Sequence, residues 1–243
     1  MSSAPTELPR RERARAATIE EIKQTALQLM HETGTTDARF TDIARSMGLT
    51  PPAIYRYFAD RDELLTALII DAYNDLGGKV AAARDTVGEH DLGGRWLAAA
   101  EAYRRWASDE PQQFALIFGL PVPGYLAPQE GPTTEAASRA LAQLAALFSE
   151  AHSTGRLAQP LIRDVDPAFL HCAAHEKQFS VIPAANFQAM LHAWASLHGF
   201  TCLEAFNHLD WMEADARDAL FGSQVLLAAR AAGLPAPAAG AQG

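Results

Sequence analysis

The chain has 243 residues, 49% of them hydrophobic, and a formal net charge of −9. This length suffices for a small domain and a larger one with its own core. The apolar runs are interrupted within about ten residues, short of the roughly 20 that cross a bilayer, and the polar N-terminus lacks the apolar core of a signal peptide. We therefore expect a cytoplasmic protein with no membrane partner.

The periodicity of the apolar residues predicts an all-α protein. Ala-rich and Leu-rich segments repeat at helical spacing, and no segment shows the alternation typical of strands. Helices are expected at about residues 18–33, 40–47, 51–58, 61–84, 92–108, 110–119, 133–154, 167–182, 186–208 and 213–232.

The segment 40–65 has the pattern of a helix-turn-helix followed by a third helix. Phe40, Ile43 and Ala44 fit one face of a short helix. Gly48 can end that helix because glycine tolerates a positive φ. Thr50 is the expected N-cap of the second helix, with a proline in its first position. This arrangement makes DNA binding the leading hypothesis.

The second helix of this pair has the composition of a recognition helix. Tyr55, Arg56 and Tyr57 offer hydroxyl and guanidinium donors suited to phosphate contacts. Ile54 and Phe58, spaced four apart, are expected to point into the core of the small domain. The donors and the core residues therefore separate onto different faces.

The charge distribution supports a basic N-terminal region. Residues 1–62 hold nine basic and nine acidic side chains, so the whole negative excess lies in residues 63–243. Residues 10–15 carry four arginines against one glutamate. A basic arm beside a helix-turn-helix typically follows phosphates or enters a minor groove, although it can also be a solvated disordered tail.

Residues 18–70 resemble the DNA-binding domain of TetR-family transcriptional regulators. The spacing of Gly34, Gly48, Tyr55, Phe58 and the pair Leu64-Leu65 carries this resemblance without a gap. It implies an N-terminal three-helix DNA-binding domain and a larger C-terminal helical domain for ligand binding and dimerisation.

This chain departs from the family pattern at several positions. Arg39 stands where the family usually has a Thr or Ser cap, and Ala38 where a larger apolar residue is common. Tyr57 replaces a usual histidine and Arg61 a usual lysine. The resemblance and the donor pattern together give these expected DNA contacts: Arg10, Arg11, Arg13, Arg15, Arg39, Thr41, Thr50, Pro51, Pro52, Tyr55, Arg56, Tyr57 and Arg61.

The same resemblance sets the expected domains. Residues 1–17 would form the basic arm, 18–65 the helix-turn-helix domain, and 66–232 the ligand-binding and dimerisation domain. The low-complexity residues 233–243 are expected to be disordered.

Residues 193–200, AWASLHGF, resemble the Trp-His-Gly signature of one TetR C-terminal subgroup. In the family the last two long helices form the dimer interface, which implies a homodimer here, although these side chains can also fill the subunit's own core. The interface candidates are Leu191, Trp194, Leu197, His198, Leu220, Val225 and Leu227.

The aromatic residues of the middle helices suggest an apolar or aromatic small-molecule effector, although each alone more often belongs to a core. Candidate pocket residues are Trp96, Tyr103, Trp106, Phe114, Phe118, Tyr125, Phe169, His175 and Phe179. The expected function is a one-component regulator, a repressor that binds a pseudo-palindromic operator as a dimer and is released by its effector.

The alternative is a helical-bundle metal protein. His171 and His175 stand four apart on one helical face, but a third ligand and the HExxH pattern are missing. There is also no glycine-rich phosphate loop and no GxSxG nucleophile motif. We therefore expect no enzymatic activity and no cofactor.

Overall fold

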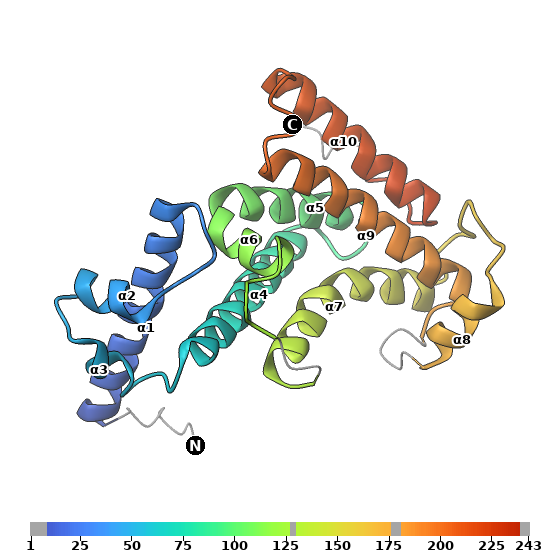
Figure 1. Cartoon of the computed structure of the whole chain (residues 1–243). Coiled ribbons are helices and arrows are strands. Elements are labelled where there is room, and N and C mark those ends of the chain that lie inside the picture. The colour runs from blue at the N-terminus through green and yellow to red at the C-terminus, as the bar shows by residue number, and fades with distance from the viewer. Residues whose placement is uncertain (1–8, 127–129, 176–180, 239–243) are drawn as a thin grey trace. The chain divides into compact units, whose positions relative to one another are not determined.

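The computed structural model describes residues 9–126, 130–175 and 181–238, apart from the side chains of Cys172 and His175. Within these ranges the chain is helical and has no strand (Figure 1). No helix there is both long and apolar enough to span a membrane. The helices are α1 (Arg10–Thr33), α2 (Phe40–Ser46), α3 (Pro51–Ile54), α4 (Arg61–Asp85), α5 (Leu92–Asp109), α6 (Pro111–Phe118), α7 (Pro132–Ser153), α8 (Pro167–His175), α9 (Ala184–Ala205) and α10 (Ala214–Ala231).

The all-α prediction is confirmed, and most expected helix ends lie within three residues of the observed ones. Two differ more. α1 begins at Arg10, eight residues earlier than expected, because Pro9 occupies its N-cap and the following Arg, Glu and Ala residues favour helix. α3 ends at Ile54 rather than near Phe58. The expected continuation of α8 to residue 182 covers residues 176–180, which lie outside the described residues, and residues 181–182, which are not helical.

The chain divides into two compact units. The N-terminal unit comprises residues 1–72 together with 112–133, and the C-terminal unit comprises residues 73–111 and 134–243. The chain therefore passes between the units three times, first inside α4. The core of the N-terminal unit holds fully buried side chains from four helices: Ile22, Ala26, Met30, Ile43, Ala44, Ile54, Leu64 and Leu65.

The C-terminal unit is built around α5 and the neighbouring helices α9 and α10. The indole of Trp96 is fully buried and donates its N–H to the carbonyl of Val225 at 3.0 Å. Arg104 on α5 forms ion pairs with Glu204 on α9 at 2.5 Å and with Asp218 on α10 at 2.8 Å. These contacts join all three helices.

The segment after α10 packs on the start of α5, in contrast to the disorder expected from residue 233 onward. Leu234 is buried, and the amide of Ala238 donates to Asp91 at 3.0 Å. A Cβ on Gly93 would lie 2.4 Å from the carbonyl carbon of Ala236. The close approach explains a glycine inside α5. Residues 239–243 lie outside the described ranges.

Candidate nucleic-acid interface

Helices α2 and α3 form a helix-turn-helix. Gly48 follows α2 with a φ of 66°, a left-handed conformation that favours glycine. The amide of Leu49 then donates to the carbonyl of Ala44 at 2.8 Å and closes the end of the helix. The sharp turn brings the chain directly to Thr50, where α3 begins.

The recognition element is a short helix followed by a turn. Thr50 occupies the N-cap of α3, but its side chain makes no capping hydrogen bond. Pro51 and Pro52 fill the first helical positions, where a missing N–H is tolerated. Beyond Ile54 the backbone continues as a turn in which the amide of Tyr57 donates to the carbonyl of Ile54 at 2.9 Å.

The side chains of this element point as the sequence predicts. Ile54 and Phe58 are buried in the core of the N-terminal unit. Tyr55 is 57% exposed, and its ring meets Phe40 edge to face at a centroid distance of 5.0 Å. This ring contact restricts the Tyr55 side chain, which is therefore partly ordered before it meets a phosphate.

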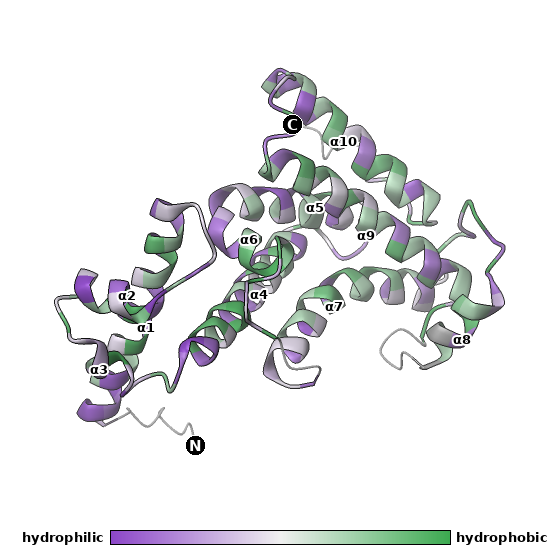
Figure 2. Cartoon of the chain, in the orientation of Figure 1, coloured by the Kyte–Doolittle hydropathy of each residue, from purple (hydrophilic) through white to green (hydrophobic). Residues whose placement is uncertain are grey.

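The arginine-rich residues expected in an arm form the first turns of α1, which Figure 2 shows as hydrophilic. Arg15 lies against the recognition element. It donates to the carbonyl of Arg56 at 2.9 Å, and its guanidinium lies 5.2 Å from the centre of the Tyr57 ring. The structure therefore brings α1 and the end of the helix-turn-helix together.

The start of α4 is fixed by local hydrogen bonds. The amide of Glu63 donates to Asp60 at 2.8 Å, and the Glu63 carboxylate accepts from the amide of Ala59 at 2.5 Å. This reciprocal pair resembles a capping box. α4 therefore begins at Arg61, directly after Asp60.

Arg61 and Arg39 differ in how much of their charge is available. Arg61 forms two close contacts with Asp37, at 2.9 and 2.8 Å, and donates to the carbonyl of Pro123 at 3.4 Å. Arg39 is 3.6 Å from the other Asp37 oxygen, and its side chain is 74% exposed. Arg39 is thus open to a phosphate, whereas Arg61 is engaged inside the unit.

Family models match both parts of this fold. Residues 22–68 match the model described as bacterial regulatory proteins of the tetR family. Residues 96–228 match the model described as a Tetracyclin repressor-like C-terminal domain, which alone covers more than half of the chain. The chain belongs to the TetR family. The Trp-His-Gly subgroup stays a prediction.

Individual relatives agree with this assignment. The HTH-type transcriptional regulator Mb1846 of Mycobacterium bovis is 47% identical over 88 residues, which cover 36% of this chain and 38% of that relative. The solved structure of the regulatory protein SCO4313 is 34% identical with a TM-score of 0.72, covering 91% of this chain and 98% of that one. RolR, solved in complex with resorcinol, is 17% identical with a TM-score of 0.51, covering 93% and 97%, and shares the fold alone.

TetR-family proteins are DNA-binding transcriptional regulators and not enzymes. This chain is accordingly a DNA-binding transcriptional regulator, and the helix-turn-helix described above lies within the residues that match the tetR-family model. The metal-binding alternative finds no support. Among the described side chains, no group of three or more His, Cys, Asp or Glu residues is placed to hold a metal ion. The side chain of His175 is not described.

The residues predicted to line a TetR-type effector pocket are divided between the two units. Phe114, Phe118 and Tyr125 belong to the N-terminal unit, where Phe114 and Phe118 contact each other at 5.3 Å. The hydroxyl of Tyr125 is 3.0 Å from that of Thr66. Trp96, Tyr103, Trp106 and Phe169 belong to the C-terminal unit. Phe179 and the side chain of His175 lie outside the described residues.

Tyr103 and Trp106 use their polar atoms inside the C-terminal unit. The hydroxyl of Tyr103 is 2.6 Å from Nδ1 of His198, and Trp106 donates to Asp75 at 2.8 Å. Burial raises the pKa of Tyr103 and lowers the pKa of His198, so both side chains are neutral near pH 7. The His198 ring stacks flat on Trp194 at 5.0 Å. Sequence periodicity gave no signal for this α5–α9 contact.

The interface candidates separate into three groups. Leu197 and Val225 are buried inside the subunit, whereas Leu191, Trp194 and His198 are partly buried, and His198 is bonded to Tyr103. Leu220 and Leu227 are exposed, at 42% and 60%. Only these two α10 residues present large apolar side chains to solvent on the last helix.

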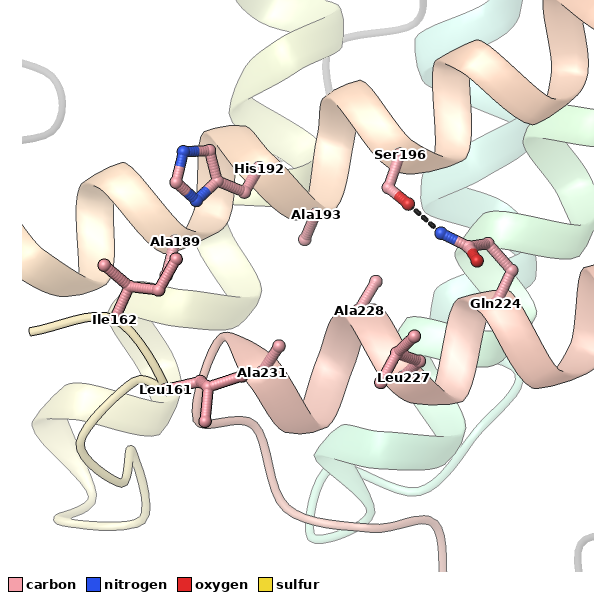
Figure 3. A pocket seen from close by; sticks show the side chains of 10 residues that line it. All are labelled: Leu161, Ile162, Ala189, His192, Ala193, Ser196, Gln224, Leu227, Ala228 and Ala231. Atoms are coloured by element: carbon pink, nitrogen blue, oxygen red, sulfur yellow. Dashed lines mark hydrogen bonds between the residues drawn. The ribbon is translucent and has the colours of Figure 1, made fainter.

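A groove of about 250 Å³ lies between α9 and α10 beside Leu227. Figure 3 shows small alanine side chains at its floor and larger side chains around them. Leu161 and Ile162, from the segment between α7 and α8, extend one end of the groove and are exposed at 77% and 53%. The lining residues are Leu161, Ile162, Ala189, His192, Ala193, Ser196, Gln224, Leu227, Ala228 and Ala231.

Proposed function

We propose that this regulator is a one-component repressor that binds a pseudo-palindromic operator as a homodimer and is released by a small apolar or aromatic effector. The observation that carries the DNA side of the proposal is the exposed Tyr55 side chain held against Phe40, in the same recognition element whose Arg56 and Tyr57 contact Arg15 of α1. Two such elements about one turn of B-DNA apart, roughly 34 Å, would read two half-sites.

The groove between α9 and α10 supports the homodimer. Its walls carry exposed leucines and its floor is alanine, so a ridge of apolar side chains can enter it. A two-fold interface uses the same patch on both copies, which requires a surface with both ridges and hollows. Leu227 supplies a ridge, and the hollow beside Ala193 and Ala228 supplies its counterpart.

The exposed row on α10 extends the same surface. Leu220, Ser223 and Leu227 are spaced three and four apart and are all exposed, so they share one helical face. None of them is charged, and a fully buried charge would oppose association. The proposed interface therefore includes Leu220 and Leu227 but not Val225.

The C-terminal unit supports an aromatic effector by its composition. Trp96, Trp106 and Phe148 are fully buried there, and the neutral Tyr103–His198 pair adds a polar group in the same unit. Such a mixture of aromatic walls with few polar groups suits a small aromatic ligand. RolR, which shares the fold, is bound to the phenolic compound resorcinol. We extend that chemical class to this chain.

Release follows from differential binding. An effector that binds one arrangement of the dimer more tightly shifts the population toward it, and DNA affinity falls by the same coupling free energy. The operator then dissociates without any covalent change. Repression results because a bound dimer occupies the operator until the effector is present.

Selection of genomic fragments by the purified protein tests the proposal. Wild type is expected to enrich one pseudo-palindromic site, and Tyr55→Ala is expected to lose it. Tyr55→Phe keeps the ring on Phe40 and removes only the hydroxyl, so it is expected to weaken the enrichment as well, and Arg45→Gln, which alters an exposed arginine of the same unit outside the expected DNA contacts, is the control that should keep it. If wild type and Tyr55→Ala enrich the same fragments, the proposed recognition element is wrong.

A further inference from the structure

Nearly all of α6 and the segment after it belong to the N-terminal unit, although they lie far from the helix-turn-helix in the sequence. Residues 112–133 cluster with residues 1–72. Within this segment, the described residues 119–126 are called the strap here. The strap carries Val122, which is buried, and Tyr125, which is partly buried.

The sequence preorganises a tight turn at the centre of the strap. Residues 122–125 read Val-Pro-Gly-Tyr, with proline in the second and glycine in the third position. The φ of Gly124 is 78°, and the amide of Tyr125 donates to the carbonyl of Val122 at 3.1 Å. These features define a type II turn. The turn's own hydrogen bond leaves the carbonyl of Pro123 unused.

Arg61 reaches this carbonyl from the first turn of α4. Its Nη1 lies 3.4 Å from the Pro123 oxygen, while Nε and Nη2 lie 2.9 and 2.8 Å from Oδ1 of Asp37. A guanidinium has donors on several sides, so one arginine can join the approach to α2, the start of α4 and the strap. A lysine has three donors on one nitrogen but lacks the planar fork with which Arg61 places two nitrogens on Asp37 and a third on Pro123.

A second contact holds the other end of the turn. The hydroxyl of Tyr125 is 3.0 Å from that of Thr66, which lies one turn and a half beyond Arg61 on α4. Val122, which precedes Pro123 and Tyr125 in the strap, is buried. The strap is therefore fixed to α4 at two points.

We propose that the strap is a built-in part of the DNA-binding unit, and that Arg61 is a positioning residue that holds it rather than a ligand of DNA phosphate. The proposal departs from the phosphate contact that the family resemblance implies for Arg61. Only its DNA consequence rests on the proposed function. Because Asp37 neutralises the guanidinium, the start of α4 offers less positive charge to DNA than its sequence suggests.

Hydrogen exchange of the full-length protein tests the strap without any DNA. The Tyr125 amide reports on the turn because it donates to Val122. Tyr125→Phe and Arg61→Gln are each expected to speed its exchange about fivefold, the effect of losing one hydrogen bond. Arg61→Lys should behave like Arg61→Gln, since an ammonium can keep Asp37 but loses the fork.

Arg45→Gln is the matched control, because Arg45 is another arginine of the same unit that pairs with a local aspartate, Asp42, at 3.1 Å. Exchange at Tyr125 should stay at the wild-type rate in this variant. Equal exchange rates in wild type, Arg61→Gln, Arg61→Lys and Tyr125→Phe would overturn the proposal that these two side chains hold the strap.

The salt dependence of operator binding tests the role of Arg61. A phosphate ligand contributes about 0.9 to the slope of log K against log salt, so removing one lowers the slope by that amount. Arg61→Gln is expected to keep the wild-type slope, whereas a slope lower by about 0.9 would make Arg61 a phosphate ligand and overturn its positioning role. If wild type selects no operator, the proposed function fails, and the exchange experiment still decides the strap.

Discussion

The indole N–H of Trp96 donates to the carbonyl oxygen of Val225 at 3.0 Å, which joins the beginning of α5 to the middle of α10. Both residues are almost completely buried. The bond is separate from the backbone hydrogen bonds within α10, because its donor comes from another helix. It ties the proposed dimer surface to the interior of the C-terminal unit.

Removing this bond should lower the free energy of unfolding. Trp96→Phe keeps most of the apolar contact but loses the donor, and we expect a loss of about 1–3 kcal/mol. Trp96→Ala adds a cavity and should cost about 3–5 kcal/mol. Urea unfolding followed by circular dichroism measures both values. A Trp96→Phe variant as stable as wild type would show that the hydrogen bond contributes nothing net.

The Tyr55 hydroxyl should contribute to operator affinity. A hydrogen bond to a charged phosphate is worth about 1.5–3 kcal/mol, so Tyr55→Phe should weaken binding roughly tenfold or more. Its thermal unfolding should not change, because the ring still meets Phe40. Fluorescence anisotropy with a labelled operator measures the affinity. Unchanged affinity would mean that the hydroxyl makes no phosphate contact.

The exposed leucine of α10 should matter for association. Leu227→Glu places a charge at the centre of the proposed interface, and we expect a monomer in sedimentation velocity with an unchanged helical spectrum. Leu126→Glu is the control, because Leu126 is 90% exposed and belongs to the N-terminal unit. A Leu227→Glu protein that remains dimeric would remove this face from the interface.

Gly93 should be required only when the C-terminal segment is present. In Gly93→Ala the new Cβ would collide with the backbone at Ala236 and Pro237, so the segment must move and stability should fall. In a chain that ends at Leu234 the same change should be neutral or stabilising, because alanine favours helix by about 1 kcal/mol over glycine. Thermal unfolding of the four proteins in this cycle gives the coupling. If the effects of Gly93→Ala and of the truncation on stability were additive, the predicted collision with the C-terminal segment would be contradicted.

His198 should make stability depend on pH. Burial lowers its pKa below the ordinary value of 6.5, so the unfolded chain binds a proton more readily than the folded one. Stability should therefore be complete above pH 6.5 and decrease as the pH falls toward the lowered pKa. Urea unfolding from pH 8 to pH 5, compared with His198→Gln, measures this. Parallel curves for the two proteins would exclude His198 as the source.

Local signals made much of the fold predictable. Gly34 and Gly48 end their helices in the left-handed conformation, and Ile54 and Phe58 are buried as their spacing predicts. The start of α1 was missed because its arginines were interpreted by charge alone, although they also favour helix. Charge indicates a partner for a residue but does not determine its backbone conformation.

The candidate sites were harder, because their roles depend on contacts between residues distant in sequence. Arg15 meets Arg56 and Arg61 meets Pro123 across 41 and 62 positions, so periodicity cannot reveal either contact. Val225 and Leu227 lie on one helix, two residues apart, yet one is 1% and the other 60% exposed. Distinguishing them required the position of α5.

The N-terminal unit is discontinuous in the sequence, since residues 112–133 complete what residues 1–72 begin. A fragment that stops at Ala72 would lack the strap and leave Arg61 without its Pro123 partner. In chimeric regulators made by grafting only the first 72 residues onto another sensor domain, the DNA-binding unit should therefore be less well ordered. A successful transplant has to carry the second segment as well.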